Sequence, residues 1–96
     1  MIIKLENEIK HGDKAIQELE VREPFVKLIR RLGSPVKVNP KTGETDFNYD
    51  ACCKYLEELN QLPPSVINQL TYKDFMRCVN QLLVFFNVGD SSQMTA

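Results

Sequence analysis

Residues 2–21 read IIKLENEIKHGDKAIQELEV, and this stretch decides the fold class. Apolar side chains recur on both sides of its polar centre KHGDK, at Ile3, Leu5, Ile9, Ile16, Leu19 and Val21. This pattern predicts a β-hairpin. The three-residue step from Ile16 to Leu19 breaks the two-residue period and predicts a bulge in the second strand. Since a lone hairpin is only marginally stable in water, helices are needed against one of its faces.

The rest of the chain carries helical periodicity. Four helices are predicted, at about residues 24–32, 48–62, 64–70 and 72–88. Pro24 suits the opening position of the first helix, because the N–H that it lacks has no intrahelical acceptor there. The apolar stripe of that helix comprises Phe25, Leu28, Ile29 and Leu32. The sequence therefore predicts an α+β fold, an N-terminal β-hairpin (about 2–21) followed by a small helical bundle.

The later helices have recognisable start and stop signals. Asp46 or Asn48 can cap the second helix. Thr71 and Asp74 offer a capping box to the last helix, with Asp in place of the usual Glu or Gln. The predicted core stripes are Tyr49, Cys52, Cys53, Leu56 and Leu59 in the second helix, and Phe75, Cys78, Val79, Leu82, Leu83 and Phe86 in the last.

The prolines and glycines divide the chain. Residues 33–46 contain two prolines and Gly43, a composition that favours turns, so an exposed loop is predicted there. A chain of 96 residues has the size of one domain. We therefore expect a single domain over 1–89, with a flexible C-terminal tail over 90–96.

Composition restricts the partners. Hydrophobic residues make up 43% and charged residues 26%, as in folded globular proteins, and the net charge of −1 gives no field that would attract nucleic acid or an anionic membrane. The longest apolar run, residues 82–86, is far short of the roughly 20 residues that span a bilayer. We expect neither nucleic acid nor a membrane as a partner. We also expect the protein to remain in the compartment where it is synthesised.

No catalytic or metal-binding pattern emerges from the residue spacing. The only histidine, His11, falls in a predicted turn, and Cys52 and Cys53 lie on a helical stripe where thiols act as small hydrophobes. Glu57 and Glu58 diverge by about 100° on a helix, with no neighbour suited to raise a pKa. We predict that the chain is not an enzyme and binds no cofactor or metal.

A basic cluster leaves one alternative open. Lys27, Arg30 and Arg31 carry positive charge, and residues 63–75 allow two helices joined by a tight turn, as DNA-reading modules require. The second of those helices would offer few side chains able to reach bases. A small DNA-binding regulator therefore stays an alternative and not the preferred interpretation.

The last predicted helix has more apolar surface than its core stripe needs. At about 100° per residue, Val84 lies nearly opposite Phe75, with Val88 beyond it and Phe85 on the flank. Scattered exposed apolar residues are common on proteins. Three together, one of them a Phe, favour a partner-binding surface of Val84, Phe85 and Val88, which could also serve self-association.

Three segments in this order resemble one family. They are the hairpin over 3–19, the VREP transition at 21–24, and LNQLPPSVINQLTYKDF at 59–75. Together they resemble the tail assembly chaperones of contractile-tailed bacteriophages, of the kind of tail assembly protein E. The resemblance covers most of residues 2–88, except the central loop, and rests on the order and spacing of the segments.

The resemblance implies a role in building a phage tail. It implies a non-structural protein in the cytoplasm of the bacterial host that binds the tape measure protein and keeps it soluble. It also implies help in recruiting tail tube protein, and absence from the finished virion. A minor structural tail protein is the remaining alternative.

Overall fold

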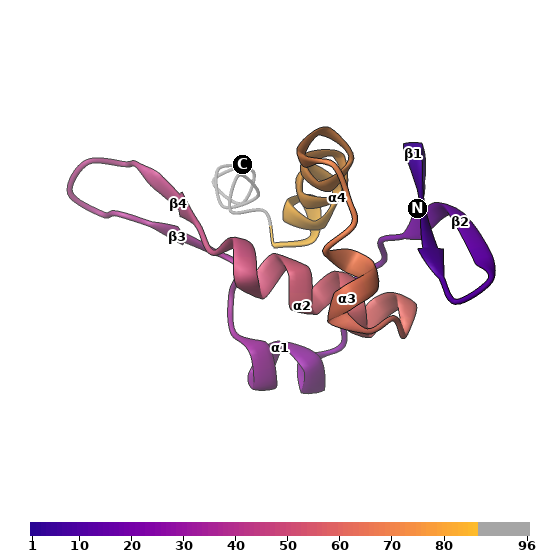
Figure 1. Ribbon diagram of the computed structural model, residues 1–96. Coiled ribbons are helices and arrows are strands. Elements are labelled where there is room, and N and C mark those ends of the chain that lie inside the picture. The colour runs from indigo at the N-terminus through magenta and orange to yellow at the C-terminus, as the bar shows by residue number, and fades with distance from the viewer. Residues whose placement is uncertain (87–96) are drawn as a thin grey trace.

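The computed structural model describes residues 1–86. The elements run in the order β1 (Ile2–His11), β2 (Lys14–Glu20), α1 (Val26–Leu32), β3 (Val36–Val38), β4 (Thr45–Phe47), α2 (Tyr49–Asn60), α3 (Pro64–Ile67) and α4 (Tyr72–Phe85). The predicted α+β fold is confirmed, with an N-terminal antiparallel hairpin followed by helices (Figure 1). The predicted tail at 90–96 lies outside the described residues.

The two strands of the first hairpin are unequal in length. Ile3 pairs with Leu19 and Ile9 with Ile16. Between these two pairs β2 advances by three residues and β1 by six. The irregularity therefore places its extra residues in β1, and the prediction of a bulge in the second strand was wrong. The reason lies in α4, which binds the backbone of the extra residues, as described below.

Side-chain amides from the helices hold both ends of this hairpin. Gln69 accepts a hydrogen bond from the Lys10 N–H at 2.8 Å and donates one to the Lys10 carbonyl at 2.7 Å. Asn60 of α2 does the same at Glu20, at 2.8 and 3.0 Å. Each amide makes the two backbone hydrogen bonds that a neighbouring strand would make. The strand edges at Lys10 and Glu20 are therefore not free to pair with another strand.

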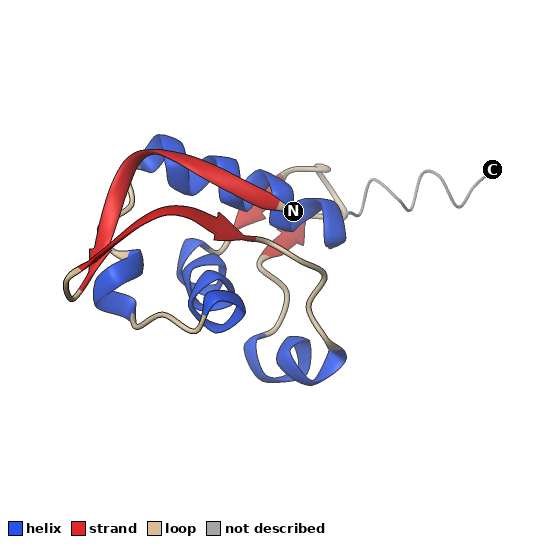
Figure 2. Cartoon of the chain, turned by 90° about the vertical axis from the view of Figure 1, so that its right-hand side faces the viewer, coloured by secondary structure: helices blue, strands red, loops and turns tan. Residues whose placement is uncertain are grey.

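The helix α2 crosses the centre of the molecule, side-on in Figure 1 and end-on in Figure 2. Asn48 caps it by accepting from the Ala51 N–H at 3.1 Å, which confirms one of the two predicted caps. Its buried residues are Ala51, Cys52, Tyr55, Leu56 and Leu59. Tyr49, predicted in this stripe, is instead 45% exposed, because it stacks on Phe47 beside the second hairpin.

The first helix starts later than predicted. Pro24 is buried before the helix, Phe25 is the N-cap with extended backbone, and α1 begins at Val26. Phe25 therefore stands outside the helical period, and its side chain is 79% exposed where a core position was predicted. None of the residues of α1 is buried, although Leu28 and Leu32 pack partly against the core.

The segment predicted as a loop at 33–46 holds a second hairpin, so that prediction was wrong. In β3 and β4, Val36 pairs with Phe47 and Lys37 with Asp46. The prolines flank β3 and do not interrupt it, and Gly43 takes a positive φ of 77° in the connection, which favours glycine. Residues 39–46 are exposed, as predicted, and the hairpin projects from the start of α2 (Figure 1).

The core lies between the first hairpin, α2, α3 and α4. It consists of Ile3, Leu19, Val21, Cys52, Tyr55, Leu56, Leu59, Ile67, Cys78, Val79 and Leu82. In α4 the predicted stripe is confirmed, since Cys78, Val79 and Leu82 are buried and the rest of the stripe packs against them. This core fixes which faces of α1 and α4 remain exposed.

Candidate functional site

The predicted partner-binding residues at the end of α4 have different environments. Val84 is 54% exposed, as expected for a residue off the core stripe. Phe85 packs against the core and is half-buried, contrary to the prediction. The reason is helical geometry: Phe85 follows the buried Cys78 by seven residues, about two turns, and so shares its face. Val88 lies outside the described residues.

A larger exposed apolar surface lies at the start of α1. Phe25 is 79% exposed and Val26 is 67% exposed, next to each other in the chain. Together with Leu28 of α1 and Leu59 of α2 they line a groove of about 750 Å³. Figure 2 shows α1 standing apart from the other helices on two connecting segments. We call this region the α1 groove.

Charged side chains surround the α1 groove. Four are basic (Arg22, Lys27, Arg30 and Arg31) and two are acidic (Glu23 and Glu58), which gives the lining a charge of +2. The whole chain carries −1. Arg31 binds Glu58 at 2.8 Å, and Arg22 lies 3.7 Å from Glu20. The α1 groove is thus a locally positive region on a chain of slight negative charge.

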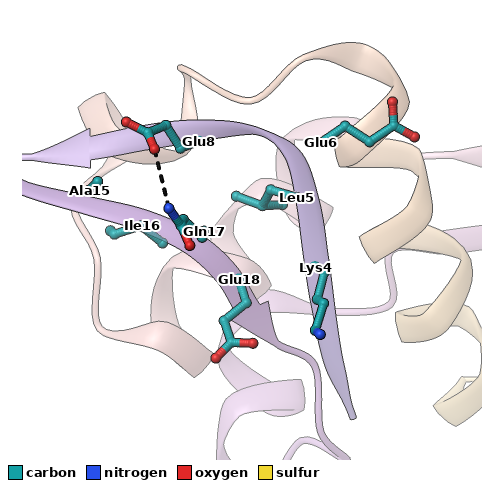
Figure 3. Close-up of a pocket in the computed structure, with 8 residues that line it drawn as sticks. All are labelled: Lys4, Leu5, Glu6, Glu8, Ala15, Ile16, Gln17 and Glu18. Carbon is teal, nitrogen blue, oxygen red and sulfur yellow. Dashed lines mark hydrogen bonds between the residues drawn. The ribbon is translucent and has the colours of Figure 1, made fainter.

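A second groove, of about 720 Å³, lies on the first hairpin where the register shift separates the strands (Figure 3). Leu5 lies between the two strands there, and Gln17 donates a hydrogen bond to Glu8 across them at 3.4 Å. Glu6 points away from the groove and pairs with Lys73 of α4 at 3.2 Å. Glu8 and Glu18 also line this groove, and their exposed carboxylates form a solvated acidic face.

Four aromatic side chains gather where β4, α2 and α4 meet. Phe47 stacks on Tyr49 with ring centroids 6.1 Å apart, and Phe75 meets the edge of Tyr49 at 5.9 Å. The neighbouring hydroxyl of Tyr72 raises the pKa of Tyr49. Tyr72 is 69% exposed. The ring contacts of Tyr49 with Phe47 and Phe75 link the second hairpin to α2 and α4, although Phe47, Tyr49 and Tyr72 remain exposed.

One charged side chain, Asp74, is fully buried among the described residues. Its carboxylate accepts hydrogen bonds from the Glu6 N–H at 3.0 and 3.1 Å and from the Asn7 N–H at 3.0 Å. Arg77 donates to it at 3.3 Å and also to the Lys4 carbonyl. Asp74 thus binds the backbone of the extra residues of β1, about 68 positions earlier in the chain. The predicted capping box did not indicate this contact.

The pKa of Asp74 reflects these contacts. Burial alone raises the pKa of the carboxyl, but the hydrogen bonds from Glu6, Asn7 and Arg77 outweigh burial, so that the pKa lies below its ordinary value of 3.8. A carboxylate held ionised by backbone donors is a poor proton carrier at neutral pH. Its geometry is that of a structural group.

The other candidates for chemistry have ordinary structural positions. His11 is exposed at the end of β1, and no group of three potential metal ligands occurs within the described part of the chain. Burial raises the pKa of Cys52 and of Cys78 to about 11. Burial, followed by the charge of Asp50, raises the pKa of Glu57, where no such neighbour was predicted. Asp50 precedes Glu57 by seven residues in α2, about two turns, and so lies on the same face.

The helices that resembled a DNA-reading pair use their basic side chains internally. Lys73 pairs with Glu6, and Arg77 binds the Lys4 carbonyl and Asp74. At the start of α4 both basic side chains therefore contact the first hairpin, although Lys73 remains 72% exposed.

Residues 1–86 define a small α+β module whose exposed large apolar side chains lie at the start of β1, at the start of α1, at the end of α4 and in the aromatic group. A family model described as "Phage tail assembly chaperone proteins, E, or 41 or 14" matches residues 2–87. The chain belongs to this phage tail assembly chaperone family, which confirms the resemblance of its three segments.

The other comparisons add no relative. No curated protein and no solved structure matches the chain. Within the part that the structure describes, no helix has both the length and the apolar character needed to cross a bilayer. Membership of a chaperone family implies protein partners in tail assembly.

Proposed function

We propose that this chain is an assembly chaperone that binds the tape measure protein, keeps it soluble and helps recruit tail tube protein. It acts in the cytoplasm of the bacterial host, has no enzymatic activity and is absent from the finished virion. The observation that carries this proposal is the family match over residues 2–87. The exposed apolar side chains of the described residues support it, because chaperones bind apolar surface.

A physical need underlies this function. A long helical protein that waits for its tube exposes apolar surface, which promotes aggregation unless another protein covers it. Helix-in-groove packing covers such surface without covalent chemistry. The tube protein must later displace the chaperone, so an interface of modest size is expected.

We place the contact at the end of α4, on Val84 with Phe85 and Val88. Burial of the half-exposed Val84 contributes about 1–2 kcal/mol before docking costs. Phe85 packs partly on the core, so it would add only its remaining exposed edge. Val84 is therefore the residue at which binding can be changed without disturbing the fold.

The test is co-expression with the tape measure protein and measurement of the soluble fraction of that protein. Val84→Asp should lower the soluble fraction and the amount of co-purified complex. Ile2→Asp is the matched control, because it places the same charge at another exposed β-branched side chain, 50% exposed at the start of β1. Circular dichroism checks that both variants fold.

Three outcomes would contradict parts of the proposal. If Val84→Asp binds like the parent chain, the contact lies elsewhere. If the parent chain leaves the tape measure protein insoluble, the function is wrong. If mass spectrometry finds the chain in high copy in purified virions, it is a structural subunit and not a chaperone.

A further inference from the structure

We propose that the α1 groove binds an amphipathic helix of another protein whose apolar face is flanked by Asp and Glu. This surface is separate from the end of α4 and does not depend on the function proposed above. Its occupant is defined by two properties of the groove, an apolar lining and a positive rim.

The apolar lining is exposed more than folding requires. Phe25 is the most exposed large hydrophobic side chain of the described residues, at 79%, and its neighbour in the chain, Val26, is 67% exposed. Leu28 and Leu59 continue the same lining toward α2. The groove is open to solvent along one side, which suits the apolar stripe of a helix better than an enclosed small molecule.

The structure of α1 explains why this surface remains uncovered. The helix has seven residues, none of them buried, and it contacts mainly α2. Phe25 caps the helix from an extended backbone position, so its ring points away from the stripe that faces the core. Phe25 and Val26 are thus exposed to solvent beside the groove, where a partner can bury them.

The positive rim selects the charge of the partner. Among the described residues, Lys27 and Arg30 make no ion pair, and they are three positions apart on one side of the helix. Arg31 is already bound to Glu58. Carboxylates on an incoming helix would therefore meet two available cations beside an apolar contact, a complementarity that favours acidic over basic segments.

Nucleic acid fits this surface less well than an acidic helix does. Binding of duplex DNA depends on several cations that each neutralise a phosphate, and the lining has a net charge of only +2. Duplex DNA would also leave Phe25 and Val26 without a contact, because its phosphates bind cations and not apolar side chains. The mixed lining thus matches a protein segment with apolar and acidic side chains.

The experiment uses the full chain and two synthetic helical peptides of about 18 residues, roughly five turns. One carries leucines at helical spacing with glutamates between them, and the other has lysines in place of the glutamates. Fluorescence anisotropy should show the acidic peptide binding roughly tenfold tighter than the basic one, with the difference shrinking as salt rises.

Variants locate the site. Phe25→Ser and Val26→Asp should each lower the affinity for the acidic peptide roughly tenfold. The double variant Lys27→Glu with Arg30→Glu should bind the acidic peptide no more tightly than the basic one. Tyr72→Ser is the control, because Tyr72 is another exposed aromatic side chain, 69% exposed at the start of α4, and it should leave peptide binding unchanged. Because this readout uses peptides and not tape measure protein, its failure is distinguishable from failure of the chaperone function.

Several results would overturn the inference. They are equal binding of the two peptides, unchanged binding by Phe25→Ser, and binding of a DNA duplex in preference to the acidic peptide. Sedimentation that shows a dimer of the parent chain dissolved by Phe25→Ser would assign the surface to a second copy instead.

Discussion

Replacement of Asp74 by Ala tests the contact on which the arrangement of the first hairpin depends. The substitution removes the acceptor for the backbone N–H groups of Glu6 and Asn7, which lie in the extra residues of β1. It also removes one of two partners of the Arg77 guanidinium. Since the side chain of Asp74 is fully buried, water replaces these bonds poorly.

The magnitude follows from the number of bonds lost. A hydrogen bond to a charged acceptor contributes about 1.5–3 kcal/mol, so two backbone donors give a loss of about 3–6 kcal/mol. A domain of 96 residues has a net stability of about 5–14 kcal/mol at the usual values per residue. Asp74→Ala should therefore remove a large part of the stability, and Asp74→Asn, which keeps one acceptor oxygen, should remove less.

Urea unfolding followed by circular dichroism measures this effect. Asp50→Ala is the matched control, because Asp50 also lies in the first turn of a helix, but its side chain is 79% exposed and pairs with Lys54 at 3.2 Å. Both substitutions lose the same favourable interaction with the helix dipole. The control should cost about 0.5–1 kcal/mol, against about 3 kcal/mol or more at Asp74. Equal losses at the two positions would refute the buried-carboxylate argument.

The same residue predicts a pH dependence. Because the pKa of Asp74 lies below 3.8 in the folded chain, its contribution to the free energy of unfolding is complete above pH 3.8. That contribution is lost as the pH falls from 3.8 through the lowered folded pKa. The stability difference between the parent chain and Asp74→Ala should therefore narrow below pH 3.8, as urea titrations at several pH values would measure. A constant difference across this range would contradict the pKa direction.

Two further predictions concern the core and the thiols. Leu82→Ala, at a fully buried position in α4, should cost about 2–5 kcal/mol in urea unfolding, and Val84→Ala on the exposed face about 0.5 kcal/mol or less. Similar costs at both positions would mean that the faces of α4 are misassigned. In thiol labelling followed by mass spectrometry, the half-buried Cys53 should react first, while Cys52 and Cys78 react only after denaturation. Equal labelling of Cys78 and Cys53 in the native chain would argue against the burial of Cys78.

Local sequence signals predicted the elements that short-range physics determines. Alternation identified the first hairpin, and the preference of Asn and Thr for helix N-termini located the caps, Asn48 and Thr71. The second hairpin was missed, because strands of three residues between prolines and glycines leave no periodic pattern. The register shift was misplaced for a different reason. Its cause is a carboxylate 68 positions away, and no local pattern shows such a contact.

The two phenylalanines show where helical periodicity assigned side chains to the wrong environment. Periodicity assigned Phe25 to the core and Phe85 to a partner, and the structure gives Phe25 the exposed position and Phe85 a place against the core. A stripe argument holds only inside a helix, and Phe25 precedes the first helical residue. Phe85 lies inside its helix, and its seven-residue distance from Cys78 already indicated the buried face. In this chain the apolar residue just before a helix start is therefore more exposed than the one inside the long stripe, and among the described residues it lies beside Lys27 and Arg30, which make no ion pair.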